Sequence, residues 1–309
     1  APELRAYQVA LHFEYAFPAD TPLGQCWRYD SGMQLAEPLV SSWKARLSLG
    51  FSRIDDKTVL SERSHDGPLV VQKSLYPEGS GVCHAIVVHP PGGIAGGDEL
   101  VLEARAGEGA SALLTTPGAT KWYRSAGAWA RQRIAFEVKG TLEWLPQETI
   151  VFDGALGDTG CEVDLAADAG IIGWDIVCLG RTGSGERFSR GVFRSSMQIR
   201  REGKLLWLER ARIDGGGRLL DSPAGLGGSP VFGTLFACCS NLNHELVAEM
   251  RKIAPETGRG AVTLLPGILL ARYLGDSTEA ARRYFIALWR ILRPELAGRD
   301  AIEPRIWST

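Results

Sequence analysis

The chain lacks a surplus of either charge. Its 34 lysines and arginines are nearly balanced by 36 aspartates and glutamates, which leaves a net charge of -2. Proteins that bind polyanions usually carry a marked basic surplus. The composition therefore argues against a nucleic-acid partner. It is typical of an ordinary globular protein whose 309 residues suffice for one large domain or two smaller ones.

Long apolar runs are also missing. The longest, residues 260–270, is interrupted by proline and glycine, and a membrane helix needs about 20 apolar residues. The first 17 residues contain Glu3, Arg5, His12 and Glu14, so they have neither the basic head nor the continuous apolar stretch of a signal peptide. We therefore expect a cytoplasmic protein that makes no use of a membrane.

Cysteine spacing excludes two further classes. The six cysteines include no CxxC pair, and Cys238 and Cys239 are neighbours. A structural zinc site or a disulfide framework would need a different spacing. The cysteines are interpreted as reduced thiols that behave as small apolar side chains.

Catalytic and nucleotide motifs are absent as well. Residues 92–99, GGIAGGDE, have two glycines five positions apart, but Asp98 and Glu99 stand where a phosphate loop has lysine and serine or threonine. GxGxxG, GxSxG and HExxH do not occur. We therefore expect no nucleotide to be bound by this chain.

What the sequence does contain is a succession of short strand patterns. Residues 1–42 show no clean period and are interpreted as an N-terminal extension, whereas residues 43–309 are expected to form a single β-rich domain. Turns at Asp55-Asp56 and at Asp66-Gly67-Pro68 separate three strands near its start. Alternating patterns bounded by glycine, proline or aspartate then predict a mainly β, layered or sandwich-like stack, with strands at 84–89, 99–105, 110–116, 128–138, 141–145, 148–152, 161–166, 171–179, 190–200 and 204–213.

The C-terminal part, residues 240–309, is different and is predicted to be a small α+β part with two helices. The first helix lies within 241–254, and the second is capped by Asp276 or Ser277 and stopped by Pro294. Two strands around a Pro-Gly turn lie between them. The glycine-rich residues 214–230 are interpreted as a long mobile loop, and no internal repeat is apparent.

The segment from Cys83 to Asp98 joins an apolar strand to a rigid bend. Cys83 and His84 should point to opposite faces of the strand, so they are not expected to share a metal ion. Two alternatives stay open: His84 and His89 are hydrogen-bonded core or turn residues, or His84, His89 and Asp98 form the site of a metal-dependent hydrolase. The bend itself is built from Pro90, Pro91, Gly92, Gly93, Gly96 and Gly97.

Carboxylates inside apolar strands are a second feature. Glu143, Glu148 and Asp175 interrupt otherwise apolar runs, and a buried carboxylate costs several kcal/mol unless it is paired, hydrogen-bonded, protonated or bound to a cation. One reading is a wet, acidic interior path that passes divalent cations by weak oxygen coordination. In the other, each carboxylate faces solvent or pairs with an arginine.

A third feature is a run of two aromatic residues between two cations. Lys121, Trp122, Tyr123 and Arg124 follow a Thr-Pro-Gly turn. Arginine and aromatic residues gather at protein interfaces, but they also stack within one sheet. Both interpretations stay open.

Six blocks of sequence, in this order, carry a resemblance: GPLVVQKSLYPEG, CHAIVVHPPGGIAGGDEL, LLTTPGATKWYRS, LEWLPQETIVFDGA, GWDIVCLGR and the terminal PRIWST. Together they closely resemble the UreD family of urease accessory proteins, also called UreH, over roughly residues 43–309. The resemblance implies a β-helical stack of strand layers with a few helices near the C-terminus.

The resemblance also implies a function. Proteins of this family act as scaffolds without turnover of their own: they bind the urease apoprotein, recruit UreF and through it the GTPase UreG, and pass Ni²⁺ in transit toward the urease active site. The acidic strand positions Glu143, Glu148 and Asp175 then become the preferred candidates for lining the metal path, followed by Asp98, Cys83, His84 and His89. A purely structural adaptor is the remaining alternative.

Overall fold

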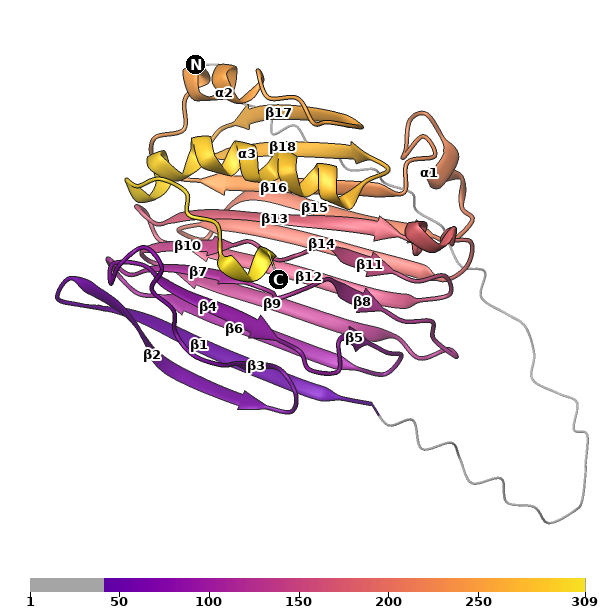
Figure 1. The fold of residues 1–309 in the computed structure, drawn as a ribbon, viewed down its shortest axis with the longest axis horizontal. Coiled ribbons are helices and arrows are strands. Elements are labelled where there is room, and N and C mark those ends of the chain that lie inside the picture. The colour runs from indigo at the N-terminus through magenta and orange to yellow at the C-terminus, as the bar shows by residue number, and fades with distance from the viewer. Residues whose placement is uncertain (1–41, 309) are drawn as a thin grey trace, which may run out of the picture. The chain divides into compact units, whose positions relative to one another are not determined.

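The computed structural model describes residues 42–308, so the predicted extension falls almost entirely outside the described residues. These residues form two large sheets with helices near the C-terminal end (Figure 1). No helix among them is long and apolar enough to cross a membrane.

The first sheet has seven strands in the order β15-β14-β12-β9-β6-β1-β2. Its central strands β1, β6, β9, β12 and β14 run parallel, and hairpins add β2 and β15 at the two edges. The strands are β1 (Lys44–Ile54), β2 (Lys57–Asp66), β6 (Glu99–Ala106), β9 (Ala130–Val138), β12 (Leu156–Leu165), β14 (Val192–Arg201) and β15 (Lys204–Asp214).

The second sheet has eleven strands, with a main path in the order β17-β18-β16-β13-β10-β7-β4-β3 and three short strands beside it. The main-path strands are β3 (Val70–Val71), β4 (Cys83–Val88), β7 (Ser111–Thr115), β10 (Thr141–Trp144), β13 (Gly170–Leu179), β16 (Val231–Cys238), β17 (Arg259–Leu265) and β18 (Ile268–Gly275). The short strands are β5 (Gly93–Ile94), β8 (Thr120–Trp122) and β11 (Thr149–Val151).

The chain passes from one sheet to the other in successive coils, such as β7 and β8 in the second sheet followed by β9 in the first. Each coil pairs in parallel with the next, so the body is a β-helical stack and the predicted fold class is confirmed. Alternate side chains of both sheets, among them Leu102, Ile134 and Val163, fill the space between the sheets. Strand alternation thus predicted the layers correctly, but the repeat of coils was missed.

The second sheet is buried on both faces, because α3 (Thr278–Ala297) covers the face turned away from the first sheet (Figure 1). On β13, Ile171 and Val177 pack between the sheets, whereas Ile172 and Trp174 pack toward the helix. The near-continuous apolar pattern of β13 follows from this double burial.

Both predicted C-terminal helices are present, with one correction. Asn243 caps α2 (His244–Met250) and Ser277 caps α3, each by accepting a backbone N–H. Pro294, however, does not stop α3, which ends at Gly298 in the left-handed conformation.

The glycine-rich residues 214–230 have local structure of their own. They contain the short helix α1 (Arg218–Asp221) and several backbone hydrogen bonds, including Leu226 N to Leu219 O at 2.9 Å. The segment is therefore a loop with a helical turn and internal hydrogen bonds, and its mobility stays a prediction.

Candidate functional site

Three successive coils of the second sheet break at the same level. Residues 89–92 separate β4 from β5, residues 116–119 separate β7 from β8, and residues 145–148 separate β10 from β11. Each break contains a proline, which has no N–H to donate to a ladder. Because the strands before and after the breaks pair with their neighbours in turn, the interruptions lie side by side.

A cavity of about 370 Å³ lies at these breaks, between the two sheets. His89, Pro117 and Gln147 line it from the breaks. The facing side belongs to the first sheet and is mixed. It has the apolar residues Leu100, Leu102, Ile134 and Met197 beside Gln132, Thr159, Cys161, Ser195 and Ser196. Such an enclosed space with a few convergent polar groups is the usual form of a small-ligand site.

Asp175 brings a carboxylate to this cavity. It lies on β13, half-buried, beside the strand breaks. Burial raises the pKa of its carboxyl to about 6, and the negative charge of Glu209 adds to the effect. No lysine or arginine among residues 42–308 shares an ion pair with it. A buried carboxylate without a cation of its own favours a positively charged ligand.

Neighbouring strands continue this polar region across both sheets. Thr234 is the register partner of Asp175, and Arg272 is the partner of Thr234. The Arg272 guanidinium donates to Thr234 Oγ1 at 2.6 Å and to Glu209 Oε1 of the first sheet at 2.6 Å. Glu209 is therefore neutralised by Arg272, whereas Asp175 is not.

Sulfur atoms face the carboxylate region from the first sheet. Cys161 on β12 and Met197 on β14 are register partners and both line the cavity. Burial, together with the negative charges of Asp175 and Glu162, raises the pKa of the Cys161 thiol to about 12. At neutral pH Cys161 is therefore a thiol, a weak ligand unless a metal displaces its proton.

His89 and Trp122 complete the lining with unsatisfied nitrogen atoms. Within the part of the chain that the structure describes, His89 Nε2 and Trp122 Nε1 are buried without a hydrogen-bond partner. Burial lowers the pKa of His89, although Asp98 opposes the effect, so its imidazole is neutral at pH 7. A neutral imidazole nitrogen is a good ligand for nickel, copper or zinc.

Glu143 lies elsewhere. It is fully buried on the helix side of β10, where Arg293 Nε donates to Oε1 at 3.0 Å and Trp289 Nε1 donates to Oε2 at 2.6 Å. Burial raises the pKa of Glu143, and Arg293 counters this. The expectation that Glu143 lines the path is wrong for this cavity, because its strand position faces α3.

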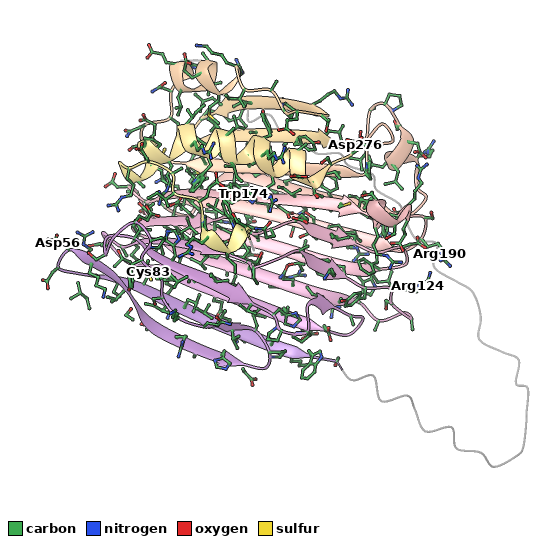
Figure 2. All side chains as sticks on the ribbon, viewed as in Figure 1. Asp56, Cys83, Arg124, Trp174, Arg190 and Asp276 are labelled. Atoms are coloured by element: carbon green, nitrogen blue, oxygen red, sulfur yellow. The ribbon has the colours of Figure 1, made fainter. Side chains whose placement is uncertain are left out.

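His84 belongs to the same buried cluster. Its Nε2 lies 2.5 Å from Glu78 Oε1, which also accepts from Arg293 at 2.6 Å. Cys83 faces the other way, into the space between the sheets, so the predicted divergence of these two side chains is confirmed. Cys83 does not line the cavity, and burial raises the pKa of its thiol. Figure 2 labels Cys83 and Trp174.

Asp98 and Glu148 are also absent from the cavity lining. Asp98 accepts the backbone N–H of Trp43 at 2.7 Å and that of Ala95 at 2.7 Å, so it fixes the end of the glycine bend. Within residues 42–308 no three histidine, cysteine or acidic side chains lie close enough to hold a metal ion. The alternative hydrolase site of His84, His89 and Asp98 is therefore not assembled.

The bend after β4 is as tight as predicted. Gly92 and Gly97 have φ angles of 75° and 97°, where other residues are strained. A Cβ atom on Gly93 would lie 2.4 Å from the Tyr123 ring, and one on Gly96 would lie 2.4 Å from Ser125 Oγ. Pro90 and Pro91 form the turn between β4 and β5.

The run from Lys121 to Arg124 divides between interior and surface. Lys121 and Trp122 line the cavity, and Trp122 is 1% exposed. Tyr123 and Arg124 are exposed. Only the second half of the run is thus available to a partner protein.

Sequence reasoning found Asp175 and His89 but missed Cys161, Met197 and Gln147. One signal was present: Pro90, Pro117 and Pro146 recur at intervals of 27 and 29 residues, each directly after a strand pattern. That period marks the coils and the level at which they break.

Comparison with known proteins shows which family the chain belongs to. The family model described as UreD urease accessory protein matches residues 44–308. A "Urease accessory protein UreD" of Azoarcus sp. (strain BH72) is 57% identical over 269 residues, which cover 86% of this chain and 94% of the relative. The protein of that name from Dechloromonas aromatica is 54% identical over 286 residues, or 90% and 99% of the two chains. The one from Pseudomonas aeruginosa is 53% identical over 271 residues, or 87% and 96%. The chain belongs to the UreD family of urease accessory proteins.

Proposed function

We propose that this chain, an accessory protein of urease maturation, is a scaffold that conducts Ni²⁺ through the cavity between its sheets. In this proposal it binds the urease apoprotein and works with UreF-like and UreG-like partners in the cytoplasm. The GTPase activity belongs to the UreG-like partner, and this chain has no turnover of its own.

The observation that supports the proposal is the unpaired carboxylate of Asp175 in the cavity. With a pKa of about 6 it is mostly ionised at pH 7 and has no protein cation to neutralise it. His89 lines the same cavity, and its Nε2 has no hydrogen-bond partner among residues 42–308. Separate single donors of this kind bind a divalent cation weakly, which suits passage better than storage.

The test is the substitution Asp175→Asn, which keeps the size of the side chain and removes its charge. Asp164→Asn is the matched control, because Asp164 is exposed on the outer face of β12. Each variant is co-expressed with urease and the accessory partners, and urease activity is measured together with recovery of the accessory complex.

We expect Asp175→Asn to lower urease activation at least tenfold while complex recovery stays normal, and Asp164→Asn to behave as wild type. Normal activation with Asp175→Asn would exclude Asp175 as a station and favour a purely structural adaptor. Loss of activation together with loss of the complex would also contradict the conduit role of this residue.

A further inference from the structure

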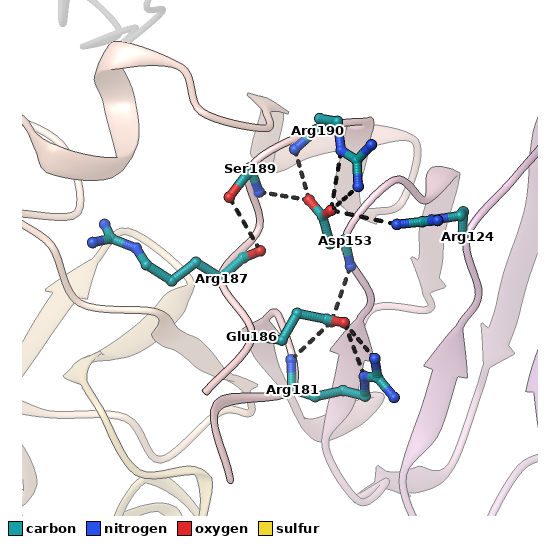
Figure 3. Close-up of polar contacts among 7 residues, drawn as sticks. All are labelled: Arg124, Asp153, Arg181, Glu186, Arg187, Ser189 and Arg190. Carbon is teal, nitrogen blue, oxygen red and sulfur yellow. Dashed lines mark hydrogen bonds and ion pairs between the residues drawn. The ribbon is translucent and has the colours of Figure 1, made fainter. Parts of the chain in front are cut away.

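Two partly buried carboxylates organise the loops at one end of the strand layers. Asp153 accepts the backbone N–H groups of Ser189 and Arg190, each at 2.8 Å, and the Arg190 guanidinium at 2.8 Å (Figure 3). Glu186 accepts the backbone N–H of Asp153 at 3.1 Å and the Arg181 guanidinium at 2.5 Å. These bonds join the loop that follows β11 to the loop between β13 and β14.

The result is a surface on which arginines project, whereas the two carboxylates that hold the loops do not. The side chains of Asp153 and Glu186 are only 11% and 19% exposed, whereas those of Arg124 and Arg190 are 65% and 67% exposed. We call Arg124, Arg181, Arg187 and Arg190 the arginine surface. Figure 2 shows Arg124 and Arg190 near each other at this end of the layers.

Much of the hydrogen-bonding capacity of these arginines is unused among residues 42–308. A guanidinium has five N–H groups, and Arg190 directs two of its side-chain nitrogens to Asp153. Arg124 lies 3.8 Å from Asp153, beyond hydrogen-bond distance. Arg187 pairs with Asp221, but both side chains are 73% exposed, and exposed pairs of this kind exchange readily with other partners.

Aromatic side chains and a cleft accompany the charges. Arg181 stacks on the Phe152 ring at 4.7 Å, and the exposed Tyr123 meets the edge of that ring with centroids 5.2 Å apart. A cleft of about 280 Å³, lined in part by Arg187, Phe188 and Leu220, lies beside them. Arginine and aromatic residues around a cleft are typical of protein-binding hot spots.

We propose that the arginine surface docks an acidic segment of a partner protein. Fixed guanidinium groups are suited to bidentate binding of carboxylates. Acids such as Asp221 lie among these arginines and would repel a continuous row of phosphates. The surface therefore suits a protein segment of mixed composition better than a nucleic-acid backbone. The chain as a whole, moreover, carries no basic surplus.

The position of this surface connects it with the cavity. Tyr123 and Arg124 directly follow Lys121 and Trp122, which line the cavity. A partner docked on the arginine surface therefore lies next to the cavity. This part of the inference rests on the proposed function, because only a conduit gives that proximity a purpose.

The test uses the full chain and three fluorescent probes: a 12-residue peptide of glutamate and alanine, the same peptide with glutamine in place of glutamate, and a 12-nucleotide RNA. The variant is Arg124→Glu with Arg187→Glu, because neither guanidinium donates a hydrogen bond to Asp153 or Glu186. The matched control is Arg46→Glu with Arg283→Glu, two exposed arginines elsewhere that also pair with glutamates. Thermal unfolding by circular dichroism checks that all proteins are folded.

We expect the glutamate peptide to bind wild type and control alike, and the Arg124/Arg187 variant at least tenfold more weakly. The affinity should fall as salt rises, and the glutamine peptide should not bind. Three results would each overturn the proposal: an equal loss of peptide affinity in the control, unchanged affinity in the Arg124/Arg187 variant, or tighter binding of the RNA than of the glutamate peptide. No nickel is present in this assay, so its failure is distinct from a failure of the conduit.

Discussion

Arg293 and Glu143 form a fully buried ion pair between α3 and the second sheet, with Arg293 Nε 3.0 Å from Glu143 Oε1. Arg293 also donates to Glu78 at 2.6 Å and to the backbone carbonyl of Asp300. One guanidinium therefore connects the helix, the sheet, the loop before β4 and the C-terminal segment.

Substitution of Arg293 by methionine should destabilise the protein strongly. It leaves Glu143 and Glu78 buried without their cation, and loss of one partner of a buried pair costs about 3–5 kcal/mol. The free energy of unfolding in urea measures the effect. Arg283→Met on the same helix is the control, because Arg283 pairs only with exposed glutamates and its loss should cost no more than about 1 kcal/mol. Equal stability of the two variants would show that the buried cluster does not hold α3 in place.

The bend after β4 should tolerate no side chain at Gly93. An added methyl group would lie 2.4 Å from the Tyr123 ring, and overpacking of this kind costs about 1–3 kcal/mol. Gly118→Ala in the neighbouring break is the control, because a Cβ atom there would meet nothing within 4 Å. If the clash with the Tyr123 ring causes this loss of stability, then the double variant Gly93→Ala with Tyr123→Ala should be almost as stable as Tyr123→Ala alone. A cost that persists in the double variant would refute this explanation.

The charge of Asp175 should reduce stability at neutral pH. Its pKa is about 6 in the folded chain against an ordinary value of 3.8, so the folded state binds more protons between these values. The contribution of the Asp175 carboxyl to the free energy of unfolding is therefore fully present below about pH 4 and is lost as the pH rises through 6.

Asp175→Asn should accordingly be more stable than wild type at pH 7, by up to about 3 kcal/mol. The difference should nearly vanish near pH 3.5, where the wild-type carboxyl is protonated in the folded state and mostly protonated in the unfolded state. Urea unfolding at the two pH values measures it. A variant less stable than wild type at pH 7 would mean that the ionised carboxylate has stabilising contacts.

The layers of this fold were predictable because strand alternation is local. Strand patterns such as 99–105 and 171–179 coincide with β6 and β13 within one residue. The end of α3 was not predictable from the sequence. Pro294 is compatible with a helix only where buried contacts compensate for the backbone hydrogen bond that proline cannot donate. Here Arg293 supplies them, from partners about 150 and 215 residues away in sequence.

The candidate site shows the same limit. Glu143 and Asp175 both interrupt apolar strands and look alike in sequence. The second sheet is buried on both faces, so the apolar pattern does not distinguish the face toward the first sheet from the face toward α3. Asp175 faces the cavity and Glu143 faces the helix, a difference that depends on strand register across the whole sheet.

Obstruction of the cavity tests the proposed passage of nickel most directly. Ala119 lines the cavity from the second strand break, and Ala119→Trp would fill it without any change of charge. Ala167→Trp, at an exposed turn, is the control for an added indole. The measurement is the nickel content of urease after activation by each accessory complex, with complex recovery and thermal unfolding monitored alongside. We predict that urease activated with Ala119→Trp contains less than a tenth of the nickel obtained with Ala167→Trp. Equal nickel contents, with Ala119→Trp folded and bound to its partners, would contradict passage through this cavity.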